Sequence, residues 1–292
     1  GSSWFVDQFW DELDEHCVAV FTFDTWGMAK ASVWHNEIST EMREWIMEMD
    51  NEVIDKNVSR DYARVRHIGD MSFMGIGIPS SFNWMQHTKE EIANWGNASF
   101  GEYYHSEADT MEFIDKEVLK KCMHYGCSNV IDLALIPVLP MTFAPVADEI
   151  LGCLGNLIKM IEGRKDIVSL LELDKVEDMA KQFKVKALAL EEKRRIIVNK
   201  PIGSTMVMDL VLKRLSRTLM ALTCTVGGRF TQDNYGLTAL NYVIPCSESI
   251  KTLVNCPEGS HKYFLWSTAA RRDRNKISDA LRHAMNICDE VI

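Results

Sequence analysis

The first 162 residues alternate between short apolar runs and segments with helical spacing. Residues 18–24 are rich in β-branched and aromatic residues, which predicts a buried strand that ends at Asp24. Runs over 62–66 and 78–84 predict two more strands, and residues 4–14 predict a helix. Apolar residues at three- and four-residue intervals from Ile38 to Val53 predict one face of a long helix. This alternation is typical of an α/β domain.

After Gly163 the pattern becomes almost wholly helical. Apolar residues recur every three or four positions over 176–190, and a second stripe follows over 206–219. Pro201 and Gly203 interrupt the pattern between them, so we predict a helical hairpin. Residues 275–292 predict a final amphipathic helix. We therefore expect an α/β domain over 1–162 and a helical domain over 163–292.

Two segments carry candidate metal ligands. Asp24 ends the first predicted strand, at the sheet edge where open α/β proteins usually build sites. His105 lies just before Asp109, which is placed to cap a helix, with Glu112 closing a capping box three residues later. Such a cap would hold the turn that carries His105. A surface histidine in a polar loop is the equal alternative.

Five segments of the chain, including those with Asp24 and His105, match motifs of known proteins in the same order along the sequence. They are Gly1-Ser2 before Trp4, the strand ending at Asp24, residues 69–79, Tyr104-His105 with Asp109-Thr110, and residues 138–143. Together they resemble the zinc-dependent exopeptidases of the glutamate carboxypeptidase, transferrin receptor and bacterial aminopeptidase type. Residues 234–237 and 241–245 resemble the extended segment that ends the helical dimerisation domain of the receptor-like branch. The order of the matches carries more weight than any single motif.

The resemblance implies roles for three residues in peptide hydrolysis. Asp24 would bind one zinc ion and His105 the other, in a pair of zinc ions that activates a hydroxide. Tyr104 would donate its hydroxyl to the substrate carbonyl oxygen as that oxygen becomes negative. The alternative for Tyr104 is an aromatic ring packed in the neighbourhood of Tyr103 and Phe100.

Three further residues are candidates for substrate binding. Gly69 and Asp70 stand in a loop where Asp70 would recognise a substrate amine or support a metal ligand, and its equal alternative is a helix N-cap. Lys251 lies where the glutamate carboxypeptidase branch has a Lys-Tyr pair that binds the substrate's C-terminal carboxylate. No tyrosine stands beside Lys251, so a solvated loop lysine is an equal alternative.

The family's other ligands would precede residue 1. They are a histidine, a bridging aspartate and a pair of glutamates. The acidic pairs at 90–91 and 191–192 do not replace that pair, because their helical, lysine-bearing contexts predict solvated faces. One carboxylate and one imidazole cannot hold two metal ions, so we expect these 292 residues to be inactive alone. The missing N-terminal part of the peptidase domain would be the required partner.

The predicted fold is thus α/β, the second half of a zinc-exopeptidase mixed-sheet domain followed by a mostly α-helical dimerisation domain. Helices of this kind pair with a twin subunit in the receptor-like branch, which implies a homodimer. The alternative is that they pack only on their own catalytic domain. A second function also stays open, that of a non-catalytic receptor-like scaffold. Asp24 and His105 favour the enzyme, because a scaffold needs neither group.

Composition narrows the possible partners. The chain is 47% hydrophobic and 25% charged, as in ordinary globular proteins. Its net charge of -10 argues against a nucleic-acid partner, which would require a basic face. Its eight cysteines lie mostly in apolar runs without metal-type spacing, which favours reduced thiols and a cytoplasmic location. The longest apolar stretch, over 130–139, is too short to cross a bilayer, although an anchor further upstream stays open.

Overall fold

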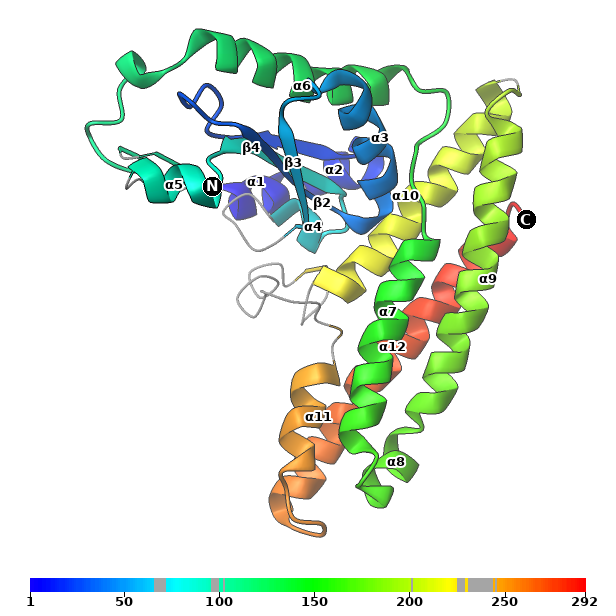
Figure 1. The fold of residues 1–292 in the computed structure, drawn as a ribbon. Helices are drawn as coiled ribbons and strands as arrows, with labels where there is room; N and C mark the ends of the chain where they lie inside the picture. The colour runs from blue at the N-terminus through cyan, green and yellow to red at the C-terminus, as the bar shows by residue number, and fades with distance from the viewer. Residues whose placement is uncertain are drawn as a thin grey trace. The chain divides into compact units, whose positions relative to one another are not determined.

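The computed structural model describes residues 1–65, 72–95, 100–101, 103–200, 202–224, 229–230, 244 and 246–292. The chain divides into two compact units, and Figure 1 labels most of their helices and strands. Unit 1 comprises Gly1–Val18, Arg66–Pro79 and Pro137–Ile292, and unit 2 comprises Ala19–Val65 and Ser80–Ile136. The division is therefore discontinuous and falls at Ile136–Pro137, whereas the sequence pattern placed a boundary between residues 162 and 163. The difference arises because the helix spanning 144–161 packs with the later helices.

Unit 2 is built on a mixed sheet. Its described strands are β1 (Val20–Phe23), β2 (Val33–Ile38), β3 (Ser59–Arg64) and β4 (Ser80–Gln86), in the spatial order β1-β4-β2-β3. β1 runs parallel to β4 and β2 parallel to β3, while β2 and β4 are antiparallel. The strands predicted over 18–24, 62–66 and 78–84 are present as β1, β3 and β4, with shifted ends. The prediction that the first of them is buried was wrong, because β1 is at the edge of the sheet and its residues are partly or fully exposed. The α/β class is confirmed.

The strand β2 was missed by the sequence pattern. Ile38 is its last residue, and α3 (Arg43–Val53) begins only after the 3-10 turn η1 (Thr40–Met42). The prediction that a helix starts near Ile38 was therefore wrong. All six residues of β2 are buried, although His35, Asn36 and Glu37 are polar. These buried polar residues hide the apolar signal by which a strand is usually detected.

The helices α3 and α6 (Lys116–Leu135) pack together beside the sheet (Figure 1). Trp34 of β2 meets Tyr125 of α6 edge to face, with ring centroids 5.5 Å apart. Asp50 of α3 is fully buried and accepts hydrogen bonds from Trp34 Nε1 and Asn129 Nδ2, both at 3.0 Å. Burial raises the pKa of Asp50, against the effect of these hydrogen bonds. This polar centre joins α3, α6 and β2.

The helix that follows His105 starts later than the predicted capping box. Residues 111–113 form only the 3-10 turn η2 (Met111–Phe113), which has no side-chain cap. α6 begins at Lys116, and Asp115 is its N-cap, since its carboxylate accepts two backbone N–H groups of the first turn. The capping role predicted for Asp109 and Glu112 was therefore wrong. Asp115 is better placed because its backbone is extended directly before the helix.

Unit 1 is helical in its described regular structure. Its long helices are α7 (Ala144–Ile161), α9 (Leu173–Ile197), α10 (Ile202–Cys224) and α12 (His261–Asp289). Its short helices are α1 (Ser2–Gln8), α2 (Trp10–His16), α4 (Ser72–Gly75), α8 (Lys165–Leu171) and α11 (Cys246–Val254). A break at Phe9 separates α1 from α2, where one helix was predicted. α9 packs against α7 and α12, whereas α10 packs mainly against α12 and α4, so α9 and α10 are not a simple hairpin.

The apolar stripes of these helices are largely covered within unit 1. The buried members of the α9 stripe are Val176, Phe183, Ala187 and Leu190. On α12, Ile277 and Leu281 are fully buried, and the helix starts at His261, well before the predicted start at 275. On α10 the predicted apolar stripe is buried only in part, because Met206 and Leu210 are 65% and 52% exposed. Unit 1 thus covers most of the α9 and α12 stripes by itself, while part of the α10 stripe is exposed, and the homodimer stays a prediction.

Two carboxylates predicted to lie on solvated faces have structural partners. Glu191 of α9 accepts the backbone N–H groups of Phe143 and Ala144, both at 3.0 Å, and so caps the N-terminus of α7. Glu91 of α5 (Lys89–Trp95) accepts the Thr88 N–H and the Ser32 hydroxyl. Both acidic pairs thus contribute a carboxylate to the fold.

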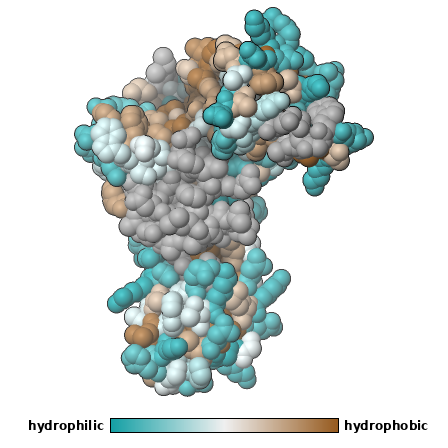
Figure 2. Space-filling view, turned by 90° about the vertical axis from the view of Figure 1, so that its left-hand side faces the viewer, coloured by the Kyte–Doolittle hydropathy of each residue, from teal (hydrophilic) through white to brown (hydrophobic). Residues whose placement is uncertain are grey.

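Composition-based predictions agree with the described part of the chain in two respects. None of the described helices combines the length and apolarity that crossing a membrane requires. Cys122 and Cys288 are fully buried, and burial raises the pKa of their thiols to about 11 and about 12. On the face drawn in Figure 2, hydrophobic residues in brown alternate with hydrophilic residues in teal.

Arg164 connects the start of α8 with the end of α11. Its guanidinium donates to both carboxylate oxygens of Asp166, at 3.0 and 2.8 Å. It also donates to the carbonyls of Val254 and Cys256. The hydrogen bonds from Arg164 lower the pKa of Asp166 to about 2 from its ordinary 3.8.

Asp166→Asn is expected to lower the free energy of unfolding by about 1–2 kcal/mol at neutral pH. A carboxyl whose pKa is lowered by folding adds stability only while it is ionised. The difference between wild type and variant should therefore be complete above pH 4 and shrink as the pH falls toward 2. Urea unfolding of both proteins over this range measures it. A difference that does not change with pH would show that the ion pair is not its cause.

Candidate functional site

A cavity of about 990 Å³ opens in unit 2 beside the carboxyl ends of β1 and β4. Residues 25–30, which follow β1, form one part of its wall. His87, which directly follows β4, and residues between Phe100 and Ile114 form the rest. Because β1 and β4 are parallel, their following loops meet at one edge of the sheet, which is the usual position of ligand sites in α/β folds.

The two loops that line the cavity are joined at Gly27. Its carbonyl accepts the Asp115 N–H at 2.8 Å, and the adjacent Met28 forms a β-bridge with Ile114. Gly27 has a φ of +90°, and a Cβ there would lie 3.0 Å from the side chains of Ile114 and Leu119. Both the backbone conformation and the close approach therefore require glycine.

The cavity wall is mainly aromatic and apolar. The residues of this kind are Trp26, Met28, Phe100, Tyr103, Tyr104, Met111, Phe113 and Ile114. The ionisable side chains other than the tyrosines are Lys30, His87 and Asp109. A mostly apolar lining with a few polar groups is typical of sites that bind small organic molecules or peptide side chains.

Tyr104 joins the predicted site residues to this cavity. Its ring stacks on His105, with centroids 3.9 Å apart, and packs on Phe100 at 4.9 Å. Burial raises the pKa of Tyr104, and the negative charges of Asp24 and Asp109 raise it further. The phenol therefore keeps its proton at neutral pH and can donate a hydrogen bond. The contact with Phe100 also agrees with the alternative interpretation, in which Tyr104 is an aromatic ring packed near Tyr103 and Phe100.

Asp24 and His105 both lie at the surface of unit 2. Asp24 directly follows β1, and its Oδ1 accepts the Thr25 N–H at 2.7 Å. His105 has a φ of +60°, in a turn closed by the Ser106 N–H donating to the Tyr103 carbonyl at 3.0 Å. Asp24 is near enough to change the pKa of Tyr104, whose ring contacts His105. The structure thus brings the three residues into one region.

These residues do not complete a zinc centre. A carboxylate and an imidazole are both donors that zinc accepts, but a structural or catalytic zinc ion takes at least three protein ligands. Within the described ranges, no group of three or more His, Cys, Asp or Glu side chains is placed to hold a metal ion. The residues present therefore do not fit a pair of zinc ions unless further ligands join them.

Of the candidate site residues, Tyr104 lines this cavity, whereas Asp24, His105 and Lys251 are not among its lining residues. Gly69 and Asp70 lie outside the described residues, as do residues 234–237 and 241–243. Lys251 belongs to α11 of unit 1, where its side chain is 53% exposed and pairs with Glu248 at 2.8 Å. Lys251 is thus a solvent-exposed lysine, as in the alternative interpretation, but it lies on a helix and not in a loop.

Several residues of the cavity were not found from the sequence. His87 was not among the candidate site residues, but it lines the cavity, with Nε2 lying 3.1 Å from the Ala29 carbonyl. Trp26 and Phe113 were not singled out. Trp26 stands two residues after Asp24, so its position at the end of a predicted strand was a usable signal. Phe113 carried no such signal in the sequence, because its position in the cavity wall depends on tertiary structure.

The comparisons with known proteins do not identify a family. No protein-family model matches the chain, and a search of curated proteins found no significant match. The function of the site is therefore inferred from its geometry and from the motifs in the sequence.

Proposed function

We propose that this chain forms the C-terminal part of a zinc-dependent exopeptidase site, with Asp24 and His105 as metal ligands. Tyr104 would donate a hydrogen bond to the carbonyl oxygen of the scissile peptide. The observation that carries the proposal is the position of Tyr104, which stacks on His105 and is influenced by the charge of Asp24. Tyr104 itself lines the cavity, and Asp24 directly precedes the lining residue Thr25 at the end of β1.

The side chains of this chain suit parts of that reaction. Tyr104 keeps its proton because burial and two neighbouring carboxylates disfavour the phenolate. A protonated phenol stabilises a carbonyl oxygen as that oxygen gains negative charge. The stack on His105 and Phe100 fixes the ring that carries the hydroxyl. Fixed donors stabilise a transition state without reorganising during the reaction.

The proposal requires further residues. The remaining ligands and the general base would come from an N-terminal part of the peptidase domain, since no three potential ligands are grouped around a metal position among the described residues. The substrate would be a peptide bound in and beside the cavity. Pairing of the helical unit with a second copy belongs to the same proposal and rests on the resemblance alone.

Zinc analysis of the polypeptide that includes the upstream ligands tests the proposal. We expect about two zinc ions per subunit after dialysis, measured by mass spectrometry of the metal. His105→Ala should reduce this to about one, because one ion would lose a ligand. His124→Ala, which removes an exposed histidine of α6 in the same unit, should leave the content unchanged.

The same protein would be assayed with aminoacyl substrates and acidic dipeptides. Hydrolysis that depends on zinc would support the enzyme. A zinc-free protein without hydrolysis would overturn the proposal and favour the scaffold alternative.

A further inference from the structure

Trp26 is an aromatic residue of the cavity wall whose ring is held by packed neighbours and a hydrogen bond. Its indole lies 4.3 Å from the Phe23 ring and 6.4 Å from the Trp34 ring, measured between centroids. Its Nε1 donates to Asn83 Oδ1 at 3.1 Å, and Asn83 is fully buried in β4. A ring with packed neighbours and a satisfied N–H has little freedom to change its rotamer.

The helix α6 approaches the same ring at Gly126. A Cβ at Gly126 would lie only 2.4 Å from the Trp26 indole, so the ring rests directly on the helix backbone. Gly126 itself does not line the cavity. The position of Trp26 therefore depends on a residue that a ligand in the cavity would not touch. A substitution at Gly126 therefore changes the shape of the cavity wall without removing a residue that contacts the ligand.

The ionisable groups of the cavity do not favour a charged side chain. Lys30 and Asp109 have opposite charges, and both are exposed. His87 is buried and directs Nε2 to the Ala29 carbonyl. Apolar and aromatic residues outnumber the polar ones in the wall, which also includes Thr25 and Thr110. A large apolar side chain gains the most from such a surface, at roughly 25 cal/mol per Å² of apolar area removed from water.

We propose that this cavity binds a large apolar side chain of the peptide substrate, with Trp26 as the residue that determines this specificity. That the ligand is a peptide rests on the proposed function. A volume of about 990 Å³ accommodates such a side chain together with neighbouring residues. Tyr104 also lines the cavity, so the side chain would bind next to the hydroxyl that faces the scissile carbonyl.

Binding of three amino-acid amides to the 292-residue chain tests this inference. The probes are N-acetyl-phenylalaninamide, N-acetyl-alaninamide and N-acetyl-glutamate amide, titrated by NMR without added metal. We expect the phenylalanine probe to bind at least about tenfold more tightly than the alanine probe, as apolar pockets discriminate by 10–200-fold for small differences in side chain. Equal binding of these two, tighter binding of the glutamate probe, or no binding would overturn the inference.

Gly126→Ala is the variant that tests the role of Trp26. The added methyl group must displace the indole, so affinity for the phenylalanine probe should fall about tenfold. Gly152→Ala is the matched control, because a Cβ on this helical glycine meets no atom within 4 Å. Unchanged affinity in a folded Gly126→Ala protein would overturn the role of Trp26.

A second variant covers the case in which Gly126→Ala does not fold. Phe113→Ala removes a wall residue that is already 43% exposed, and it should also lower the affinity for the phenylalanine probe.

The outcomes for this inference and for the proposed function can be distinguished. Because no metal is added, the binding of the probes is independent of zinc. Preference for phenylalanine in a protein that binds no zinc would sustain this inference while the proposed function fails. Zinc-dependent hydrolysis without that preference would do the reverse.

Discussion

Tyr104→Phe is expected to lower kcat by about 10²–10³-fold in the polypeptide that includes the upstream ligands, with a much smaller change in KM. The variant removes only the hydroxyl. That hydroxyl remains protonated at neutral pH because burial, Asp24 and Asp109 all raise the pKa of Tyr104. A donor used mainly in the transition state affects kcat more than substrate binding. Steady-state kinetics with the best peptide substrate measures both constants.

Two controls separate this role from a structural one. Tyr104→Phe keeps the ring that packs on His105 and Phe100, so zinc content and the free energy of unfolding should not change. Tyr263→Phe removes a tyrosine hydroxyl in α12 of unit 1 and should leave kcat within about twofold. A Tyr104→Phe enzyme with wild-type kcat would exclude Tyr104 as the carbonyl donor. So would a loss of kcat that merely follows a loss of zinc.

The sequence was informative where apolar periodicity and tertiary structure agree. The run over 18–24 identified β1 and placed Asp24 directly after it, as the structure has it. The stripe from Val176 to Leu190 identified α9, because a helix that packs on two others must carry an apolar face. The order of motifs also grouped Asp24, Tyr104 and His105, which the structure places in one region.

Other features depend on contacts that no local pattern encodes. β2 has polar residues in a buried strand, so its sequence resembles an irregular segment. Asp115, which caps the helix in place of Asp109, has an extended backbone and also donates its N–H to the Gly27 carbonyl, far earlier in the chain. The need for glycine at position 126 arises only because the Trp26 ring lies against α6. The cavity is a product of these long-range contacts, which explains why most of its wall was not predicted.

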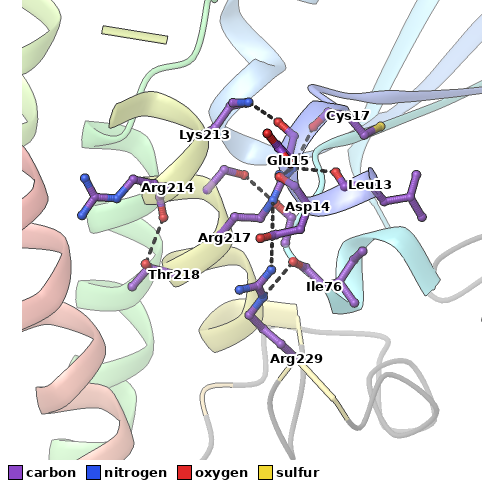
Figure 3. A network of polar contacts seen from close by, with 12 residues as sticks. Leu13, Asp14, Glu15, Cys17, Ile76, Lys213, Arg214, Arg217, Thr218 and Arg229 are labelled. Carbon is purple, nitrogen blue, oxygen red and sulfur yellow. Dashed lines mark hydrogen bonds and ion pairs between the residues drawn. The ribbon is translucent and has the colours of Figure 1, made fainter. Parts of the chain in front are cut away.

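Stability of unit 1 depends on a polar network centred on Arg217 of α10, shown in Figure 3. This buried guanidinium donates to the carbonyls of Leu13, Asp14 and Cys17 at the end of α2, at 3.3, 3.2 and 2.7 Å. It also donates to the Gly77 carbonyl at 2.8 Å and to the Asp14 carboxylate at 3.1 Å. The last carbonyls of a helix lack partners within the helix, and a cation there is favourable.

Arg217→Ala is therefore expected to lower the free energy of unfolding by about 3–5 kcal/mol, since it leaves the carbonyls of Gly77 and of the end of α2 without this donor and removes one of the arginines that pair with Asp14, beside Arg229. Arg214→Ala, on the same helix, is the matched control. Arg214 is 39% exposed and pairs with Glu290, so its loss should cost less than about 1 kcal/mol. Chemical denaturation of both variants, followed by circular dichroism, measures the two losses. Similar losses would contradict a special role for Arg217. A large loss for Arg217→Ala alone would show that this side chain is a main contributor to the contact of α10 with the end of α2, where Lys213 of α10 also donates to the Glu15 carbonyl.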